Sequence, residues 1–176
     1  DAHEYFEEVP EVVNRPMVKA IWKKLANWLI PRFDRAYTVC GSLADIFQKK
    51  YGIPFSVVRN LPFSEVPLPS PPVNEEVVEQ VRELAAMKNI ILYQGALNEG
   101  RGLDETLDAM HHLEDTILLL AGDGDIGSLL HQRVAREYLH KKVVFLGFVT
   151  PLTLRAITPF ATLGLNLLEH RGKSYY

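Results

Sequence analysis

Residues 90–124 read IILYQGALNEGRGLDETLDAMHHLEDTILLLAGDG, and this stretch decides the fold. Ile90–Gln94 and Thr116–Ala121 are apolar runs of the length expected for strands that are buried on both faces of a sheet. Leu103–His112, which lies between them, has the length of a helix. Two buried strands separated by a helix are typical of parallel α/β sheets. The stretch therefore predicts an α/β fold with a Rossmann-like, doubly wound parallel sheet.

The same alternation continues on both sides of this stretch. We expect further elements at Glu75–Met87 (helix), Gly127–Leu139 (helix), Val143–Leu146 (strand), Leu152–Ile157 (helix) and Leu163–Leu168 (strand). The strands end at Gly95, Gly122, Gly147 and Glu169, which recur every 22 to 27 residues. Right-handed crossovers place such ends along one edge of the sheet, the edge where open α/β sheets bind ligands.

The N-terminal part of the chain contains a shorter version of the pattern. Apolar residues at helical spacing predict an amphipathic helix over Val18–Phe33. Strands at Ala36–Val39 and Phe55–Arg59 should flank a helix over Leu43–Tyr51. We expect Ser42 to cap that helix and Gly52 to end it in a left-handed conformation.

The amphipathic helix allows two interpretations. In the first, its apolar side packs on a sheet. In the second, residues 18–33 lie peripherally on a membrane, because Lys19, Lys23 and Lys24 occupy the other side and basic amphipathic helices bind anionic lipid.

A change in composition separates these two regions. Residues 60–74 contain five prolines, at positions 62, 67, 69, 71 and 72, and proline at this density interrupts both helices and strands. We therefore expect the end of an N-terminal domain at residues 1–60, a hinge or linker at 61–74, and part of a C-terminal domain at 75–176.

Composition excludes several classes of function. The net charge of −3 gives no basic surface for nucleic acid. The single Cys40 rules out an internal disulfide and fits a reducing, cytoplasmic compartment. The sequence has no apolar run of about 18 residues and no signal peptide. It also begins without Met, so we expect a piece of a longer protein.

The loop Gly95–Gly102 has the features of an anion site. Its three glycines allow a ligand to approach the backbone closely, and the loop leads to the amino end of a helix, where free N–H groups favour an anion. Arg101 adds a guanidinium, which can donate two hydrogen bonds to a phosphate. The alternative is a flexible surface turn with a solvated arginine. The spacing does not match G-x-G-x-x-G, and there is no Walker lysine.

Carboxylates follow two of the other predicted strands. Asp123 and Asp125 could hold a divalent metal, but Asp and Gly are also common in tight turns, and we expect no metal. Glu169 could accept hydrogen bonds from sugar hydroxyls, or it could be an ordinary exposed acid at a strand end. The histidines do not have the spacing of metal ligands.

Three blocks of sequence together resemble the retaining GT-B glycosyltransferases of the family 4 type, also called glycosyl transferases group 1. They are 93–104 (YQGALNEGRGLD), 119–124 (LLAGDG) and 144–149 (VFLGFV). Residues 58–62 (VRNLP) resemble the hinge of that family, and residues 1–4 (DAHE) resemble the end of a strand in its acceptor domain. The resemblance covers nearly the whole chain.

The resemblance implies a two-domain enzyme with a role for several residues. Arg101 matches the basic residue that neutralises the donor diphosphate, whereas Ala96 replaces a second basic residue of the family. Glu169 matches the first carboxylate of an E-x7-E motif, and His3 matches an acceptor-domain histidine near the reacting carbon; both are expected to be catalytic. The expected donor-binding residues are Gly95, Arg101, Gly102, Gly122, Asp123, Gly147, Phe148 and Val149. The last three match the loop that contacts the base in that family.

The function that the resemblance implies is transfer of a sugar, with retention, from a nucleoside-diphosphate donor to a saccharide or lipid-linked acceptor. No cofactor or metal is expected, and the pathway would be cell-surface polysaccharide synthesis in the cytoplasm or at the inner face of the membrane. The chain stops before the second carboxylate of the motif, so this fragment is expected to be inactive alone. Two alternatives remain: a sugar-nucleotide epimerase of the same fold, and a non-catalytic nucleotide-binding or partner-binding module.

Overall fold

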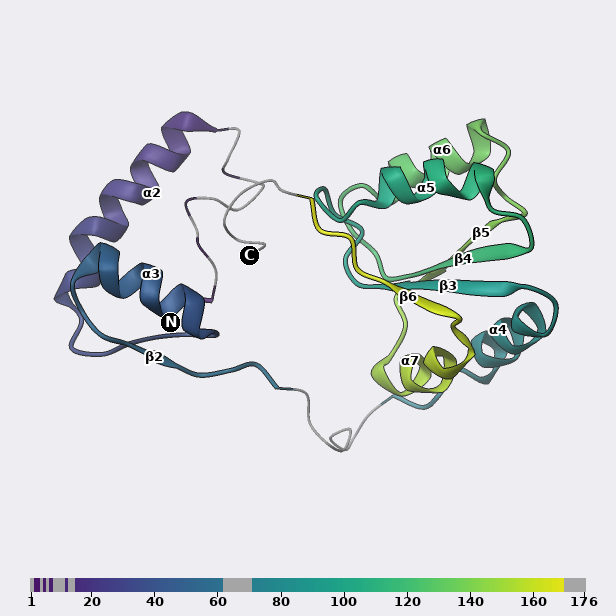
Figure 1. Ribbon diagram of the computed structural model, residues 1–176, viewed down its shortest axis with the longest axis horizontal. Helices are drawn as coiled ribbons and strands as arrows, with labels where there is room; N and C mark the ends of the chain where they lie inside the picture. Colours follow the sequence, from purple (N-terminus) through teal and green to yellow (C-terminus); the bar gives the residue numbers. More distant parts are fainter. Residues whose placement is uncertain are drawn as a thin grey trace. The chain divides into compact units, whose positions relative to one another are not determined.

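The computed structural model describes residues 2, 3, 5, 7, 12, 15–61 and 71–169. Their contacts divide them into two compact units, one before and one after the proline-rich segment. Figure 1 shows the two units with their helices and strands labelled. Each unit has its own parallel sheet and its own apolar core, so the predicted α/β class is confirmed.

The larger unit is built on a four-stranded parallel sheet. Its strands are β3 (Asn89–Gln94), β4 (Thr116–Ala121), β5 (Val143–Gly147) and β6 (Leu163–Leu165), and their order across the sheet is β5-β4-β3-β6. All three pairings are parallel. The carboxyl ends of the strands therefore point to one edge, as the sequence predicts.

Helices cover both faces of this sheet. They are α4 (Glu75–Met87), α5 (Leu103–His112), α6 (Gly127–Arg136) and α7 (Pro151–Ile157). Helices α5 and α6 lie on one face, and α4 and α7 lie on the other (Figure 1). Leu118 and Leu120 of β4 pack in the core under α5 and α6, whereas Leu119 packs in the core under α4 and α7. Burial of both faces explains why the strands are apolar at every position.

Two elements of this unit end three residues earlier than predicted, and β3, β5 and α7 differ from the predicted bounds by one residue. Strand β6 ends at Leu165 instead of Leu168, because it pairs only with residues 91–93 of the neighbouring β3 before the chain leaves the sheet. Helix α6 ends at Arg136 instead of Leu139. The chain turns at Tyr138, whose φ is +57°, and this turn places Leu139 in the core.

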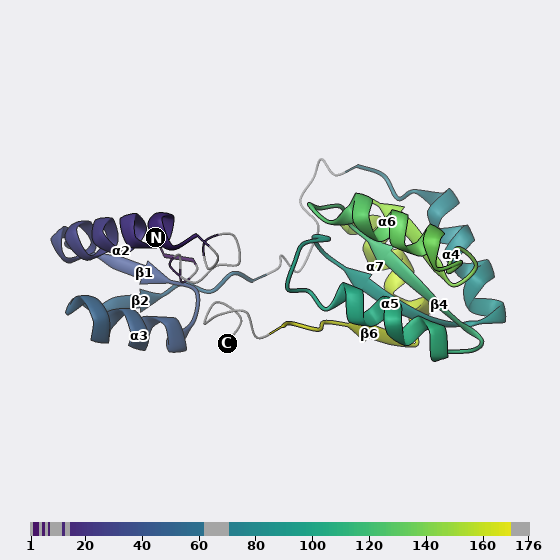
Figure 2. The same cartoon turned by 90° about the horizontal axis from the view of Figure 1, so that it is seen from above.

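The smaller unit has two parallel strands, β1 (Ala36–Thr38) and β2 (Phe55–Val57). Helix α3 (Gly41–Tyr51) connects them, and α2 (Pro16–Leu29), followed by the short 3-10 helix η1 (Ile30–Arg32), precedes them. Helices α2 and α3 lie on opposite sides of the strands (Figure 2). Ala2 extends the sheet on the other side of β1, because its N–H donates to the Tyr37 carbonyl at 3.0 Å and its carbonyl accepts from Thr38 Oγ1 at 2.6 Å.

The ends of α3 confirm one expectation and correct another. Gly52 follows the helix with φ +72°, the left-handed conformation expected of it. Ser42 does not cap the helix: Cys40 occupies the N-cap position, and Ser42 lies inside the first turn. The Ser42 hydroxyl instead lies 3.2 Å from Cys40 Sγ, and this hydrogen bond lowers the pKa of the thiol.

Helix α2 attaches to its unit by a narrow side only. Ala26 and Ile30 pack against the core of the unit, but no residue of α2 is buried. Within the described residues, none of the helices has the length and apolar character needed to cross a bilayer.

An arginine ties α5 to α6 in the larger unit. Arg133 lies in α6, and its guanidinium bonds Glu137 Oε1 at 2.9 Å and Asp104 Oδ1 at 2.9 Å. It also forms an ion pair with Asp108 of α5. Glu137 Oε2 lies 3.0 Å from His111 Nε2. The hydrogen bond from Arg133, followed by that from His111, lowers the pKa of Glu137 from 4.5 to about 2.

This lowered pKa predicts a dependence of stability on pH. A carboxylate whose pKa is depressed on folding stabilises the fold above its unfolded pKa, and this contribution disappears as the pH falls through the folded value. The contribution of Glu137 should therefore be complete above pH 4.5 and lost by about pH 2. In urea unfolding at a series of pH values, Glu137→Gln should have a lower free energy of unfolding than wild type near neutrality. Between pH 4.5 and about 2 the free energy of unfolding should fall less for the variant than for wild type. Parallel curves for the two proteins would contradict the role of Glu137.

Candidate functional site: the glycine loops at the carboxyl edge of the sheet

The carboxyl ends of β3, β4 and β5 are joined by backbone hydrogen bonds just beyond the strands. The Gly95 N–H donates to the Ala121 carbonyl at 3.0 Å, and the Gly122 N–H donates to the Gly147 carbonyl at 2.8 Å. The three glycines that the sequence places at strand ends thus lie side by side at one edge of the sheet.

Two of the loops at this edge pack directly on each other, and glycine makes this possible. A Cβ on Gly122 would lie 1.9 Å from the Gly95 carbonyl oxygen, and Gly122 has φ +149°. A Cβ on Gly124 would lie 2.6 Å from the Leu97 carbonyl oxygen. No side chain fits at either distance, so these glycines are required for the packing of loop 122–125 against loop 95–98.

Backbone and side-chain hydrogen bonds fix the two loops together. The Leu97 N–H donates to the Asp123 carbonyl at 3.0 Å, and the Ile126 N–H donates to the Leu97 carbonyl at 3.0 Å. The Asp125 N–H donates to Asn98 Oδ1 at 3.1 Å. The edge of the sheet is therefore a defined structure, which is the property a ligand site requires.

The carboxylates of loop 122–125 have ordinary turn geometry. Asp123 Oδ1 accepts from the Gly124 N–H at 2.8 Å, so it bonds the backbone of its own turn, and both Asp123 and Asp125 are exposed. In the part of the chain that the structure describes, no three His, Cys, Asp or Glu side chains group as metal ligands.

The loop from β3 to α5 approaches the chain that follows β6. Gly100 and Gly102 both have positive φ, +81° and +62°, and Gly102 is the N-cap of α5. The Gly102 carbonyl accepts from the Thr106 N–H at 3.0 Å and from its Oγ1 at 2.6 Å. A Cβ on Gly102 would lie 2.6 Å from Leu167 Cβ, so glycine is also required here to admit residues 166–169.

This approach brings Glu169 to the glycine loop. The Glu169 N–H donates to the Gly100 carbonyl at 3.0 Å, which places Glu169 beside the residue that precedes Arg101. Glu169 and Arg101 are both half-buried, and Arg101 Nε is fully buried. Arg101 and the backbone of Glu169 thus come together at the start of α5, although the two residues are far apart in the sequence.

The first turn of α5 carries acids that sequence reasoning did not weigh. Asp104 and Glu105 already complement the positive end of the helix dipole, and Asp104 is in addition paired with Arg133. These carboxylates offset part of the attraction that the helix dipole would exert on a bound anion. Arg101 and the loop N–H groups must then supply most of the attraction for a phosphate.

The residues expected to contact the base lie at the end of β5 and directly after it, and they differ from one another. Gly147 has φ +64° and open space around the position of a Cβ. Phe148 is 85% exposed, whereas Val149 is buried in the core under α4 and α7. Of these three residues, only Phe148 offers a side chain to a ligand at this edge. His3, the remaining candidate, is exposed in the smaller unit, directly after Ala2.

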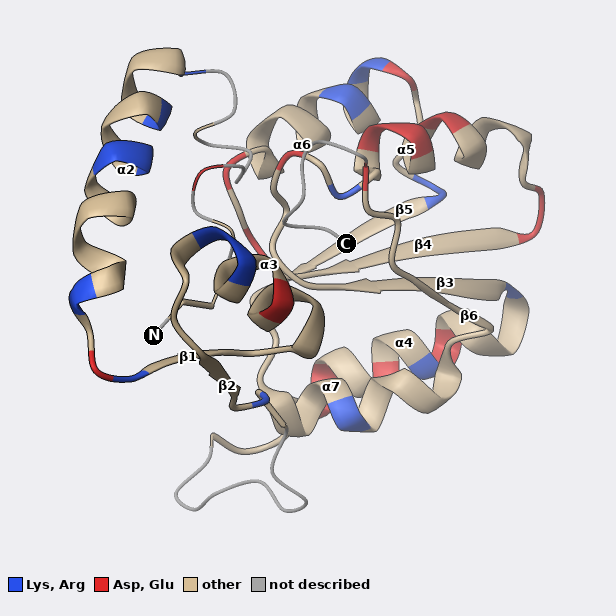
Figure 3. Ribbon diagram, turned by 60° about the vertical axis from the view of Figure 1, so that its left-hand side comes forward, with Lys and Arg blue, Asp and Glu red and all other residues tan. Residues whose placement is uncertain are grey.

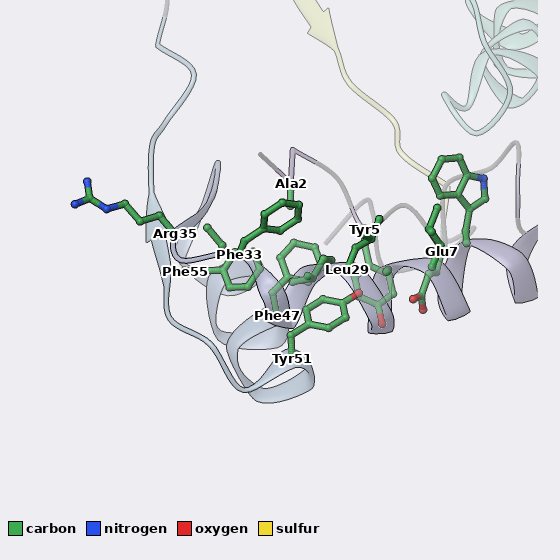
Figure 4. A pocket seen from close by; sticks show the side chains of 14 residues that line it. Ala2, Tyr5, Glu7, Leu29, Phe33, Arg35, Phe47, Tyr51 and Phe55 are labelled. Atoms are coloured by element: carbon green, nitrogen blue, oxygen red, sulfur yellow. The ribbon is translucent and has the colours of Figure 1, made fainter.

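The smaller unit contains a pocket that sequence reasoning missed. Its volume is about 290 Å³, and Figure 4 shows the side chains that line it. Its apolar lining comes from α2, α3 and the strands, and includes Trp22, Leu25, Leu29, Phe47, Tyr51 and Phe55. Phe47, Tyr51 and Phe55 recur every four residues, but nothing in the sequence pattern connects them with Trp22 of α2.

A partly buried ion pair lies at the same pocket. Lys50 Nζ bonds Glu7 Oε2 at 2.6 Å and Tyr5 OH at 3.2 Å, and it lies over the Tyr5 and Tyr51 rings. Burial alone would lower the pKa of Lys50, but the hydrogen bonds that Lys50 donates to Glu7 and Tyr5 outweigh it and raise the pKa. The ion pair and the hydrogen bond to Tyr5 fix residues 5 and 7 to α3.

Comparisons with known proteins bear on the fold. No protein-family profile matches the sequence, and no curated protein matches it either. Two solved structures of Anabaena HepE are similar, one in complex with UDP (TM-score 0.56) and one with UDP and glucose (TM-score 0.59). In both cases the identity is 19% and the match covers 92% of this chain. The chain spans 44% of the length of HepE. This chain shares its fold with part of a protein that has been solved with UDP and glucose.

Proposed function

We propose that this chain binds the nucleoside diphosphate of a sugar nucleotide and belongs to a glycosyltransferase. The observation that carries the proposal is the meeting of loop 95–102 with Glu169, through the hydrogen bond from the Glu169 N–H to the Gly100 carbonyl. It brings one cation, Arg101, and one carboxylate to the edge where α/β sheets bind ligands. The similarity to HepE, which was solved with UDP and glucose, supports the same assignment.

The chemistry suits these groups. When the bond between sugar and diphosphate breaks, negative charge grows on the phosphate oxygens. A guanidinium and fixed N–H dipoles stabilise that charge more in the transition state than in the ground state. Arg101 and the N–H groups of loop 95–102 would have this role. The Glu169 carboxylate would accept hydrogen bonds from sugar hydroxyls and stabilise the developing oxocarbenium ion.

The finer features of the proposal rest on the sequence resemblance. The transfer would retain the configuration of the sugar and require no metal. His3 would lie near the reacting carbon and Phe148 beside the base. The acceptor would be a saccharide or a lipid-linked molecule used in cell-surface polysaccharide synthesis in the cytoplasm. In front-face attack the acceptor oxygen bonds the anomeric carbon on the side from which the diphosphate leaves, and the departing phosphate takes the acceptor proton. This gives retention without an enzymic nucleophile.

Isothermal titration of the chain with UDP, GDP and ADP tests the proposal. We expect saturable binding of at least one of these nucleotides, with the same affinity in EDTA and in excess Mg²⁺. No binding of any of the three would refute nucleotide recognition. Binding that requires Mg²⁺ would refute the metal-free site.

The alternatives are separated by the fate of a sugar nucleotide incubated with the longest available form of the protein. When an acceptor is supplied, a transferase joins the sugar to it and releases the nucleoside diphosphate. An epimerase changes the sugar without forming that glycoside, and a non-catalytic module leaves the donor intact. Nuclear magnetic resonance of the anomeric proton distinguishes the three results.

A further inference from the structure

Tyr93 of β3 connects the core of the larger unit to the candidate site. It belongs to the core under α5 and α6, and only 3% of the residue is exposed. Its hydroxyl donates to the Ala96 carbonyl at 2.6 Å. Ala96 itself is exposed at the carboxyl edge of the sheet. A buried side chain thus holds the backbone of an exposed part of loop 95–98.

The peptide unit between residues 96 and 97 is held from both sides. Its carbonyl, that of Ala96, accepts from the Tyr93 hydroxyl. Its N–H, that of Leu97, donates to the Asp123 carbonyl at 3.0 Å. The C=O and N–H of a trans peptide unit point in opposite directions, so the two hydrogen bonds act on opposite sides of one plane. Together they fix the rotation of that plane.

The preceding peptide unit, between residues 95 and 96, is also fixed. The Gly95 N–H donates to the Ala121 carbonyl at 3.0 Å, and the Gly95 carbonyl points at Gly122, where a Cβ would lie 1.9 Å from its oxygen. The Ala96 N–H belongs to the same unit as that carbonyl, so it points the opposite way, away from Gly122. Because both units that meet at Ala96 are fixed, the direction of its N–H is fixed as well.

The charges around this loop make a bound anion dependent on backbone dipoles. Loop 95–102 contains one cation, Arg101, and one acid. Helix α5, which follows the loop, begins with the acids Asp104 and Glu105, and Figure 3 shows the acidic residues of this helix in red. N–H groups whose direction is set before the anion arrives need no reorganisation and stabilise its charge more effectively. A fixed N–H at Ala96 therefore favours a diphosphate at this edge.

We propose that Tyr93 is a positioning residue for the diphosphate: through the Ala96 carbonyl, its hydroxyl sets the backbone of loop 95–98 so that the Ala96 N–H donates to a phosphate oxygen. Tyr93 acts through Ala96 and not on the ligand, because it donates its hydroxyl proton to the Ala96 carbonyl. The inference rests on the proposed function and adds to it a residue from the core of the unit.

Tyr93→Phe tests this inference, because it removes the hydroxyl and keeps the buried ring. We expect the affinity for UDP to fall about fivefold, the usual effect of losing one neutral hydrogen bond. The affinity for uridine, which has no phosphate, should not change. Both affinities are measured by amide chemical shifts of the ¹⁵N-labelled chain. Ala96 is exposed, so water can replace the lost partner of its carbonyl and the variant should fold; circular dichroism checks this.

Thr162→Val is the matched control. Thr162 Oγ1 accepts from the Ile90 N–H at 3.1 Å, so this hydroxyl also bonds the backbone of the larger unit, but at the opposite end of β3. We expect the control to leave the ratio of UDP affinity to uridine affinity at the wild-type value. The free energy of unfolding of both variants is measured in urea, so that any loss of stability is separated from a loss of phosphate binding.

Three outcomes would overturn the inference while leaving the proposed function intact. They are wild-type UDP affinity in Tyr93→Phe, an equal loss of UDP and uridine affinity in that variant, and the same change of the affinity ratio in Thr162→Val. A wild-type chain that binds no nucleotide would refute the proposed function, and the inference with it.

Discussion

Replacing Arg101 by alanine is expected to weaken the binding of UDP by roughly 1.5–3 kcal/mol, the usual contribution of a hydrogen bond to a charged group. Arg101 is the cation of loop 95–102, and the acids Asp104 and Glu105 that follow it offset part of the attraction of the helix dipole. Loss of the guanidinium therefore leaves a diphosphate held by N–H groups alone. Isothermal titration of the wild type and the variant measures the difference.

The matched control is Arg136→Ala. Arg136 also lies in the larger unit, and its side chain is 74% exposed on α6. We expect its replacement to leave UDP affinity unchanged within the error of the titration. Equal losses for Arg101→Ala and Arg136→Ala would indicate a general effect of net charge and would remove Arg101 from the site.

Replacing Gly122 by alanine should destabilise the larger unit by at least about 3 kcal/mol. Its Cβ would lie 1.9 Å from the Gly95 carbonyl oxygen, and its φ of +149° is unfavourable for any side chain. To relieve the clash, loop 122–125 must separate from loop 95–98, so the hydrogen bond between Leu97 and Asp123 should also weaken. Urea unfolding measures the change in free energy.

Gly164→Ala is the control for this substitution. Gly164 lies in β6 of the same unit, is exposed, and has open space around the position of a Cβ. We expect its replacement to change the free energy of unfolding by less than about 1 kcal/mol, because the alanine meets no neighbour. If Gly122→Ala is as mild as Gly164→Ala, the close contact between the two loops does not exist in solution.

The sequence predicted the larger unit well for a physical reason. Helices α4 and α5 and strand β4 have the predicted bounds. In each of them the apolar residues recur with a regular period, and the pattern begins or ends at a recognisable boundary residue such as Gly102 or Gly122. Strand β6 was predicted too long. Leu167 and Leu168 are apolar, but they are 46% and 41% exposed and lie beyond the pairing with β3. An apolar run indicates burial in the sheet only as far as a neighbouring strand extends.

The candidate site was predicted in part. Its glycines and Arg101 could be found from spacing, and parallel topology placed their strand ends at one edge. Spacing could not show that Gly122 and Gly124 serve the packing of one loop on another, since this depends on carbonyl oxygens of residues 95 and 97. The hydrogen bond from the Glu169 N–H to the Gly100 carbonyl likewise follows from the path of the chain after β6.

The most direct measurement for the central claim is a map of amide chemical shifts during titration of the ¹⁵N-labelled chain with UDP. The account predicts that the largest changes occur at Gly95, Gly100–Leu103 and Gly122, and that they saturate together. Largest changes at amides remote from loop 95–102, or no saturable change at all, would contradict the claim that a diphosphate binds at the start of α5.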